Sequence, residues 1–70
     1  MNEKLLKIKM LEYGDTQTTL ATALGVDYCT LNYKINGRSQ FKQNEIGFIA
    51  ERYNLTAEEI QQIFFSKEVS

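Results

Sequence analysis

Residues 16–37, TQTTLATALGVDYCTLNYKING, hold two short amphipathic patterns that one glycine separates. The apolar positions are Leu20, Ala21 and Leu24 in the first pattern, and Leu31 and Ile35 in the second. Spacings of three and four residues put each set on one face of a helix. Helices of about eight residues are not stable alone in water, so packing against the rest of the chain must hold both. Gly25 can adopt the left-handed backbone that ends the first helix and turns the chain sharply into the second.

The same spacing predicts three further helices. The five expected helices span about residues 2–13, 17–24, 28–36 and 43–53, with the last beginning after Thr56. The expected apolar stripes of the three further helices are Leu6, Met10 and Tyr13, then Ile46, Ile49, Ala50 and Tyr53, then Ile60, Ile63 and Phe64. Expected N-caps are Thr16, Asp27 and Thr56, expected helix stops are Gly14, Gly25 and Gly37, and Glu59 is the expected reciprocal partner of Thr56. Phe41 is expected to plug the core, and Leu55 to anchor the last turn.

No strand-like alternation of useful length occurs and proline is absent, so the fold is predicted to be all-α with five helices. The 70 residues leave room for a single domain with a small core, placed at about 3–64, and a tail at 66–70. Gly47 lies inside the fourth helix at a cost of about 1 kcal/mol relative to alanine. This glycine indicates either that another part of the chain packs closely against the helix there or that the helix simply tolerates a glycine.

Composition narrows the classes of function. Hydrophobic residues make up 43% of the chain and charged residues 24%, and no apolar run approaches the roughly 20 residues that cross a bilayer. We therefore expect a soluble cytoplasmic protein. Histidine is absent and Cys29 is the sole cysteine, so the usual parts of acid-base, nucleophilic and zinc sites are missing. We expect no enzyme activity, no metal, no cofactor and no small-molecule ligand.

Charge is unevenly distributed along the chain. The net charge is −1, yet residues 28–44 carry three cations, Lys34, Arg38 and Lys42, and no acid. Residues 45–70 are acidic on balance. If the basic segment forms one surface and the acidic part is turned away, this asymmetry favours a polyanionic partner.

The run at 16–37 resembles the helix-turn-helix of the Cro and phage-repressor family, also called the XRE family. Its approximate pattern is TQ-x-x-LA-x-x-LGV-S-x-x-TIS-x-I-ENG, and the matching residues are Thr16, Gln17, Leu20, Ala21, Leu24, Gly25, Val26, Thr30, Asn36 and Gly37. The later IAERYNLTAEEI is similar to the signature of the family's fourth and fifth helices, and LNYKINGRSQFKQNEI resembles small repressors of Gram-positive phages and prophages. The resemblance covers about residues 3–64. It implies a lambda-repressor-like DNA-binding domain whose second motif helix enters the major groove of an operator.

Two departures from the family pattern concern packing. Many members pair an arginine in the first helix with a glutamate at the end of the recognition helix, where this chain has Met10 and Ile35. Replacing both partners of a buried ion pair by apolar groups can be neutral or stabilising, so we expect Met10 to contact Ile35. Lys34 stands where the family usually has an apolar residue, and we expect it to face solvent or reach a phosphate.

Residues opposite Leu31 and Ile35 on the third helix are the candidates for contact with DNA bases. They are Tyr28, Cys29, Asn32 and Tyr33. Asparagine can contact adenine through two hydrogen bonds, and tyrosine or cysteine can press on thymine methyl groups, which favours an A·T-leaning site. The alternative is that these side chains are merely exposed. A second set of residues is expected to contact the DNA backbone or to brace the recognition helix against it. They are Thr16, Gln17, Thr18, Lys34, Asn36, Arg38, Ser39, Lys42 and Gln43.

One recognition helix reads few bases, and the family solves this with a two-fold dimer. Candidate dimer contacts late in the chain are Phe48, Ile63 and Phe65, although Phe65 could instead fold back over the first helix. The resemblance thus predicts a homodimeric transcriptional regulator on double-stranded DNA. The alternative is an adaptor or antirepressor that binds a partner repressor, and the acidic pI of about 5.3 favours it.

Overall fold

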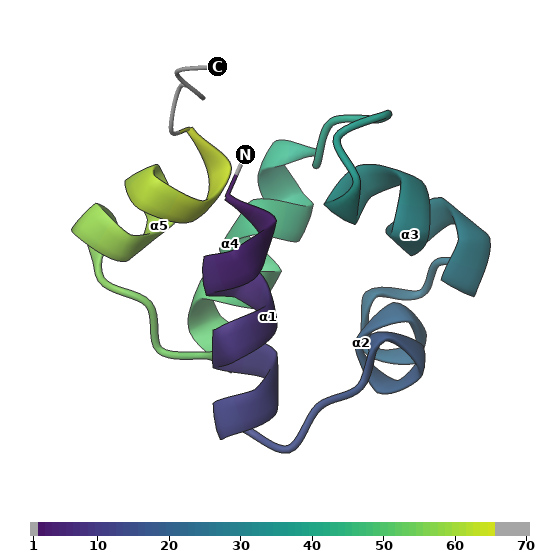
Figure 1. The fold of residues 1–70 in the computed structure, drawn as a ribbon, viewed down its shortest axis with the longest axis horizontal. Helices are drawn as coiled ribbons and strands as arrows, with labels where there is room; N and C mark the ends of the chain where they lie inside the picture. The colour runs from purple at the N-terminus through teal and green to yellow at the C-terminus, as the bar shows by residue number, and fades with distance from the viewer. Residues whose placement is uncertain (1, 66–70) are drawn as a thin grey trace.

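Five α-helices follow one another in a computed structural model that describes residues 2–65 (Figure 1). They are α1 (Glu3–Glu12), α2 (Gln17–Leu24), α3 (Tyr28–Ile35), α4 (Gln43–Arg52) and α5 (Ala57–Phe64). No strand occurs in the described residues, so the predicted all-α fold class is confirmed. Met1 and the predicted tail at 66–70 lie outside the described residues. Within residues 2–65, no helix has the length and apolar character needed to cross a membrane.

Threonine caps begin α2 and α5, as predicted. Thr16 accepts a hydrogen bond from Thr19 N at 3.2 Å, and Thr19 Oγ1 accepts one from Thr16 N at 2.8 Å. At α5, Thr56 accepts from Glu59 N at 3.1 Å and Glu59 Oε1 accepts from Thr56 N at 3.0 Å. A threonine hydroxyl therefore does at α2 what glutamate does at α5. Both capping boxes satisfy backbone donors that a helix start leaves without partners.

The connection between α2 and α3 turns at Gly25. Its φ of +75° lies in the left-handed region, which costs a glycine little. Val26 N donates to Ala21 O at 3.0 Å, which closes the end of α2 before α3 begins. Asp27 occupies the N-cap position of α3 as predicted, but its side chain makes no capping hydrogen bond.

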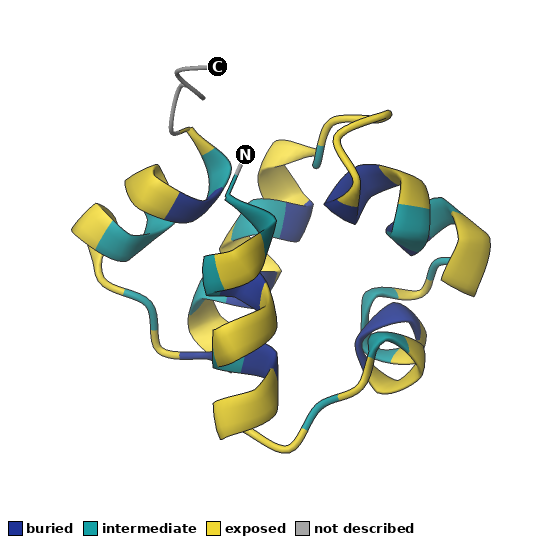
Figure 2. Ribbon diagram, viewed as in Figure 1, coloured by how far each residue is buried: buried dark blue, intermediate teal, exposed yellow. Residues whose placement is uncertain are grey.

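All five helices supply the core, and their buried sides face inward (Figure 2). The buried apolar residues are Leu6, Met10, Leu20, Ala21, Leu31, Ile35, Ile49, Tyr53 and Ile63. Helix α2 packs on α3, while α5 packs on both α1 and α4. Met10 and Ile35 both belong to this cluster, and their direct contact stays a prediction. Ile63 is 1% exposed, so its prediction as a dimer contact is wrong: its side chain completes the core beside α1 and α4.

Two peripheral positions differ from the sequence predictions. Tyr13, which was expected on the apolar stripe of the first helix, is the C-cap of α1 and is 51% exposed. Its ring lies against the ring of Tyr53, with centroids 5.3 Å apart. A Cβ built on Gly47 meets nothing within 4 Å, so this glycine reflects tolerance and not close packing.

Lys34 is buried, which corrects the prediction that it faces solvent or a phosphate. Its ammonium lies 2.6 Å from Glu45 Oε1, and the two side chains are 8% and 9% exposed. With Leu31 and Ile35, it forms an i, i+3, i+4 set, so it lies on the inward stripe of α3. Glu45 also accepts from Lys42 N at 2.7 Å. Burial alone would raise the pKa of Glu45, but these hydrogen bonds hold it below its usual value.

A double-mutant cycle tests the buried pair. Lys34→Met or Glu45→Leu alone leaves one buried charge without its partner, and each should lower the free energy of unfolding by about 3 kcal/mol. The double variant should lose less than the sum by at least about 1 kcal/mol. Urea denaturation measures all four proteins, with the exposed Glu51→Leu as a control for the loss of a carboxylate. Additive losses would show that the pair is not coupled.

Candidate nucleic-acid interface

One side of α3 is turned away from the core. Tyr28 is 52% exposed, Tyr33 is 48% exposed, and Cys29 between them is exposed as well. Asn32 is half-buried on the same side. The predicted exposure is confirmed for Tyr28, Cys29 and Tyr33, because Leu31 and Ile35 occupy the core side of the helix. We call Tyr28, Cys29, Asn32 and Tyr33 the outer face of α3.

Asn32 is the point at which α2 is tied to this face. Gln17 Nε2, in the first turn of α2, donates to Asn32 Oδ1 at 3.2 Å. Asn36 Nδ2, one turn further along α3, donates to the same oxygen at 3.3 Å. The family resemblance gives Gln17 the task of bracing the recognition helix, and the structure places its amide against α3. Two donors therefore hold the side chain of Asn32 through its amide oxygen.

The loop after α3 folds back over the end of that helix. Arg38 N and Ser39 N both donate to Tyr33 O, at 2.9 and 3.3 Å. The guanidinium of Arg38 lies 5.9 Å from the centroid of the Tyr33 ring, a cation–π arrangement. Arg38 therefore sits beside the outer face of α3. Lys42 is exposed at the far end of the same loop.

Most of the predicted backbone-contacting residues are exposed. They are Thr16, Thr18, Asn36, Arg38, Ser39, Lys42 and Gln43. Lys34 does not join them, because Glu45 neutralises it inside the protein. The exposed cations of this region are therefore Arg38 and Lys42. Glu45 also puts a carboxylate at the start of α4, which opposes binding of an anion there, whereas the first turn of α2 holds no acid.

A polar cluster that the sequence did not predict fixes the loop before α2. Asp15 accepts from Arg52 Nε at 2.7 Å and Nη2 at 2.9 Å, and from the Tyr53 hydroxyl at 2.7 Å. Thr19 Oγ1 donates to it at 2.9 Å. These bonds, that of Arg52 first, hold the pKa of Asp15 well below its usual range, although burial opposes the shift. Arg52 and Tyr53 lie far from Asp15 in sequence, so no local pattern could have shown the cluster.

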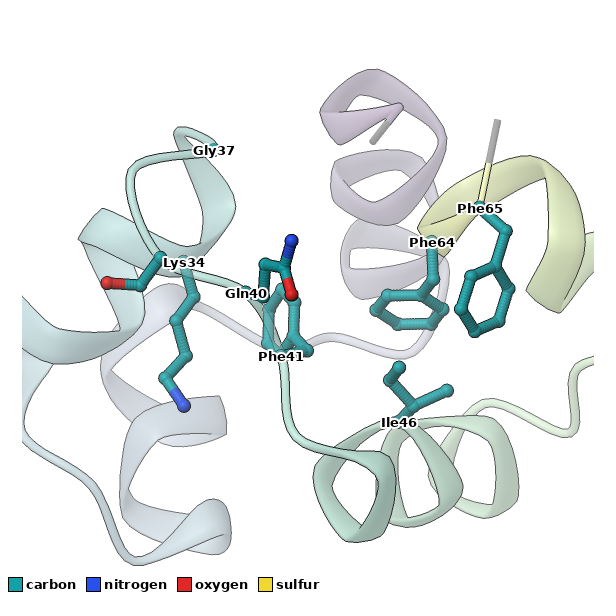
Figure 3. A pocket seen from close by; sticks show the side chains of 8 residues that line it. Lys34, Gly37, Gln40, Phe41, Ile46, Phe64 and Phe65 are labelled. Carbon is teal, nitrogen blue, oxygen red and sulfur yellow. The ribbon is translucent and has the colours of Figure 1, made fainter. Parts of the chain in front are cut away.

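A pocket of about 320 Å³ lies between the loop after α3 and helices α4 and α5 (Figure 3). Its apolar lining comes from Phe41, Ile46, Phe64 and Phe65, and the rings of Phe41 and Phe64 meet edge to face at 5.3 Å. Phe41 thus lies against the core as predicted. Phe65 is 60% exposed, so it is not buried over α1. Lys34 also lines the pocket.

Comparison with known proteins places the chain in a family. Residues 3–67 match the family described as protein of unknown function (DUF739). The chain belongs to the DUF739 family. No curated protein and no solved structure matches it. The description of the DUF739 family names no activity.

The groups at the outer face of α3 offer several kinds of contact to a partner. Two tyrosine rings, one half-buried amide and the neighbouring guanidinium of Arg38 can stack, donate hydrogen bonds and attract an anion. Within residues 2–65 of this DUF739 member, no three His, Cys, Asp or Glu residues are grouped to hold a metal ion. The outer face of α3 is thus a contact surface with a cation, Arg38, at its edge.

The Asp15 cluster makes the free energy of unfolding depend on pH in the acidic range. Because folding lowers the pKa of Asp15, its contribution is fully present above about pH 4 and is lost as the pH falls further. Asp15→Asn should lower the free energy of unfolding at pH 7 by about 1–3 kcal/mol, since it removes charge-assisted hydrogen bonds. Denaturation at pH 7 and pH 3 should show the gap between wild type and variant closing at the lower pH. A gap that stays constant would contradict the assignment.

Proposed function

We propose that the chain is a sequence-specific DNA-binding transcriptional regulator of the Cro and phage-repressor type. In this proposal α2 and α3 form the helix-turn-helix of a lambda-repressor-like domain, and α3 enters the major groove. The observation that carries it is the outer face of α3, which is exposed, braced by Gln17 and flanked by Arg38. A phage or prophage origin follows from the sequence resemblance. The protein acts in the cytoplasm, without catalysis or a cofactor.

Contacts divide into two classes in this proposal. Tyr28, Cys29, Asn32 and Tyr33 contact base edges, which carry the sequence information. The phosphate contacts come from both ends of the motif, and their residues are Thr16, Gln17, Thr18, Asn36, Arg38, Ser39, Lys42 and Gln43. Hydroxyls, amides and cations position a protein on a duplex without reading its sequence.

A homodimer on a pseudo-palindromic operator completes the proposal. One recognition helix contacts too few bases for specificity, and two copies on half-sites one turn apart supply the rest. Phe48 and Phe65 are 39% and 60% exposed and are the apolar candidates for contact between copies. Bound at a promoter, the dimer would act by excluding polymerase.

A second candidate function is an adaptor that binds a partner repressor. Leu11 is 80% exposed and Ile8 51% exposed on the outer side of α1, a surface that DNA binding does not use. The acidic pI of about 5.3 also suits a protein partner. Tight binding to a repressor without binding to any duplex would favour this candidate.

Salt dependence tests the DNA-binding proposal. Each neutralised phosphate should contribute about −0.9 to the slope of log affinity against log salt concentration. Arg38→Ala and Lys42→Ala should each weaken binding to all duplexes and reduce the size of that slope by about 1. Lys7→Ala on the outer side of α1 is the matched control and should change nothing. Fluorescence anisotropy gives the slopes, and a flat salt dependence of the wild type would refute the proposal.

Removal of the exposed rings tests the dimer. Phe48→Ser combined with Phe65→Ser should weaken assembly of two copies on an operator by at least about tenfold, because buried aromatic contacts dominate such interfaces. Binding of one copy to a half-site should remain. Leu11→Ser is the control for loss of an exposed apolar side chain. Analytical ultracentrifugation with labelled duplex distinguishes the species, and unchanged assembly would exclude these contacts.

A further inference from the structure

The carbonyl oxygen of Asn32 is already fully occupied in the free protein. It accepts from Gln17 Nε2 at 3.2 Å and from Asn36 Nδ2 at 3.3 Å. A side-chain carbonyl oxygen has two lone pairs, so two donors leave it no further capacity to accept. The amide nitrogen of Asn32 carries two N–H donors and makes no hydrogen bond within residues 2–65. Toward any partner outside the protein, Asn32 is a donor only.

This donor-only state changes which base Asn32 can contact. The two-bond contact of asparagine with adenine needs its oxygen to accept from adenine N6 while its nitrogen donates to N7. Guanine instead presents two acceptors, O6 and N7, on the same groove edge. We propose that Asn32 contacts guanine through its amide N–H groups, with Gln17 and Asn36 as positioning residues. The inference rests on the proposed DNA-binding function and replaces the expected adenine contact at this position.

The two donors keep the amide of Asn32 in this orientation. Gln17, which is half-buried, reaches the amide from the first turn of α2. Asn36 reaches it from the end of α3. Turning the Asn32 amide over would bring its N–H groups against two other N–H donors. While Gln17 and Asn36 keep their own orientation, that arrangement would lose both hydrogen bonds to Asn32, so these two donors favour the observed orientation.

Selection of duplexes from a random pool tests the base preference. Wild type should select guanine at one position of each half-site, by about tenfold over adenine. Asn32→Asp keeps the shape but presents an acceptor, and it should select cytosine on the same strand through its N4 donor. Asn36→Ala frees one lone pair of the Asn32 oxygen, so the preference for guanine over adenine should shrink or reverse. Asn44→Ala, an exposed amide on α4, is the matched control and should leave the preference unchanged.

A second measurement needs no DNA. In Asn32→Asp, the two amide donors would hydrogen-bond the new carboxylate and lower its pKa below the value of about 3.9 for a free aspartate. Adding Asn36→Ala removes one donor, so the pKa of the introduced carboxyl should rise, as followed by NMR titration. Thermal unfolding by circular dichroism confirms that each variant is folded.

The outcomes separate the inference from the function. Selection of adenine by the wild type, lost in Asn32→Ala, would overturn the inference and leave the DNA-binding function standing. A carboxyl pKa that does not respond to Asn36→Ala would overturn the hydrogen-bond arrangement itself. Failure to select any duplex would overturn the DNA-binding function, and the base preference with it, while the titration still reports on the two amide donors.

Discussion

Five short helices depend on one another because none is long enough to be stable alone. Each contributes at least one aliphatic side chain that is almost completely buried, and the most buried ones are Leu6, Leu20, Leu31, Ile49 and Ile63. These residues meet in a single cluster, so the loss of any helix would expose the apolar faces of the others. The small size of the domain makes this shared core its main source of stability. The outer sides of the helices are consequently free to differ in chemistry.

Polar contacts then fix how the helices are oriented around that core. Lys34 and Glu45 join the end of α3 to the start of α4, and Asp15 joins the loop before α2 to Arg52 at the end of α4. Lys9 and Glu59 link α1 to α5 at 2.6 Å, on a more exposed site where solvent weakens the attraction. Each pair connects segments distant in sequence. Two of the three flank the α2–α3 unit, which holds that unit in place on α4.

The outer face of α3 is presented before any partner binds. The inward stripe of the helix includes a lysine, and Glu45 compensates its charge, so the helix does not need to rotate to expose it. Gln17 and Asn36 fix Asn32, and Arg38 lies against Tyr33. A surface that is ordered in advance loses less conformational entropy on binding. The proposed recognition function therefore rests on rigidity as much as on the identity of the exposed groups.

The sequence by itself determined the five helices, the threonine caps and the turn at Gly25, because these depend on residues only a few positions apart. It also determined which side of α3 is exposed, since Leu31 and Ile35 identify the core side by their spacing. The tertiary structure decided that Lys34 and Ile63 are buried and that Tyr13 is exposed, and it created the Asp15 cluster. Whether a charge is buried depends on a partner from another helix, here Glu45. No local pattern specifies such a meeting, because packing brings together segments that the chain separates.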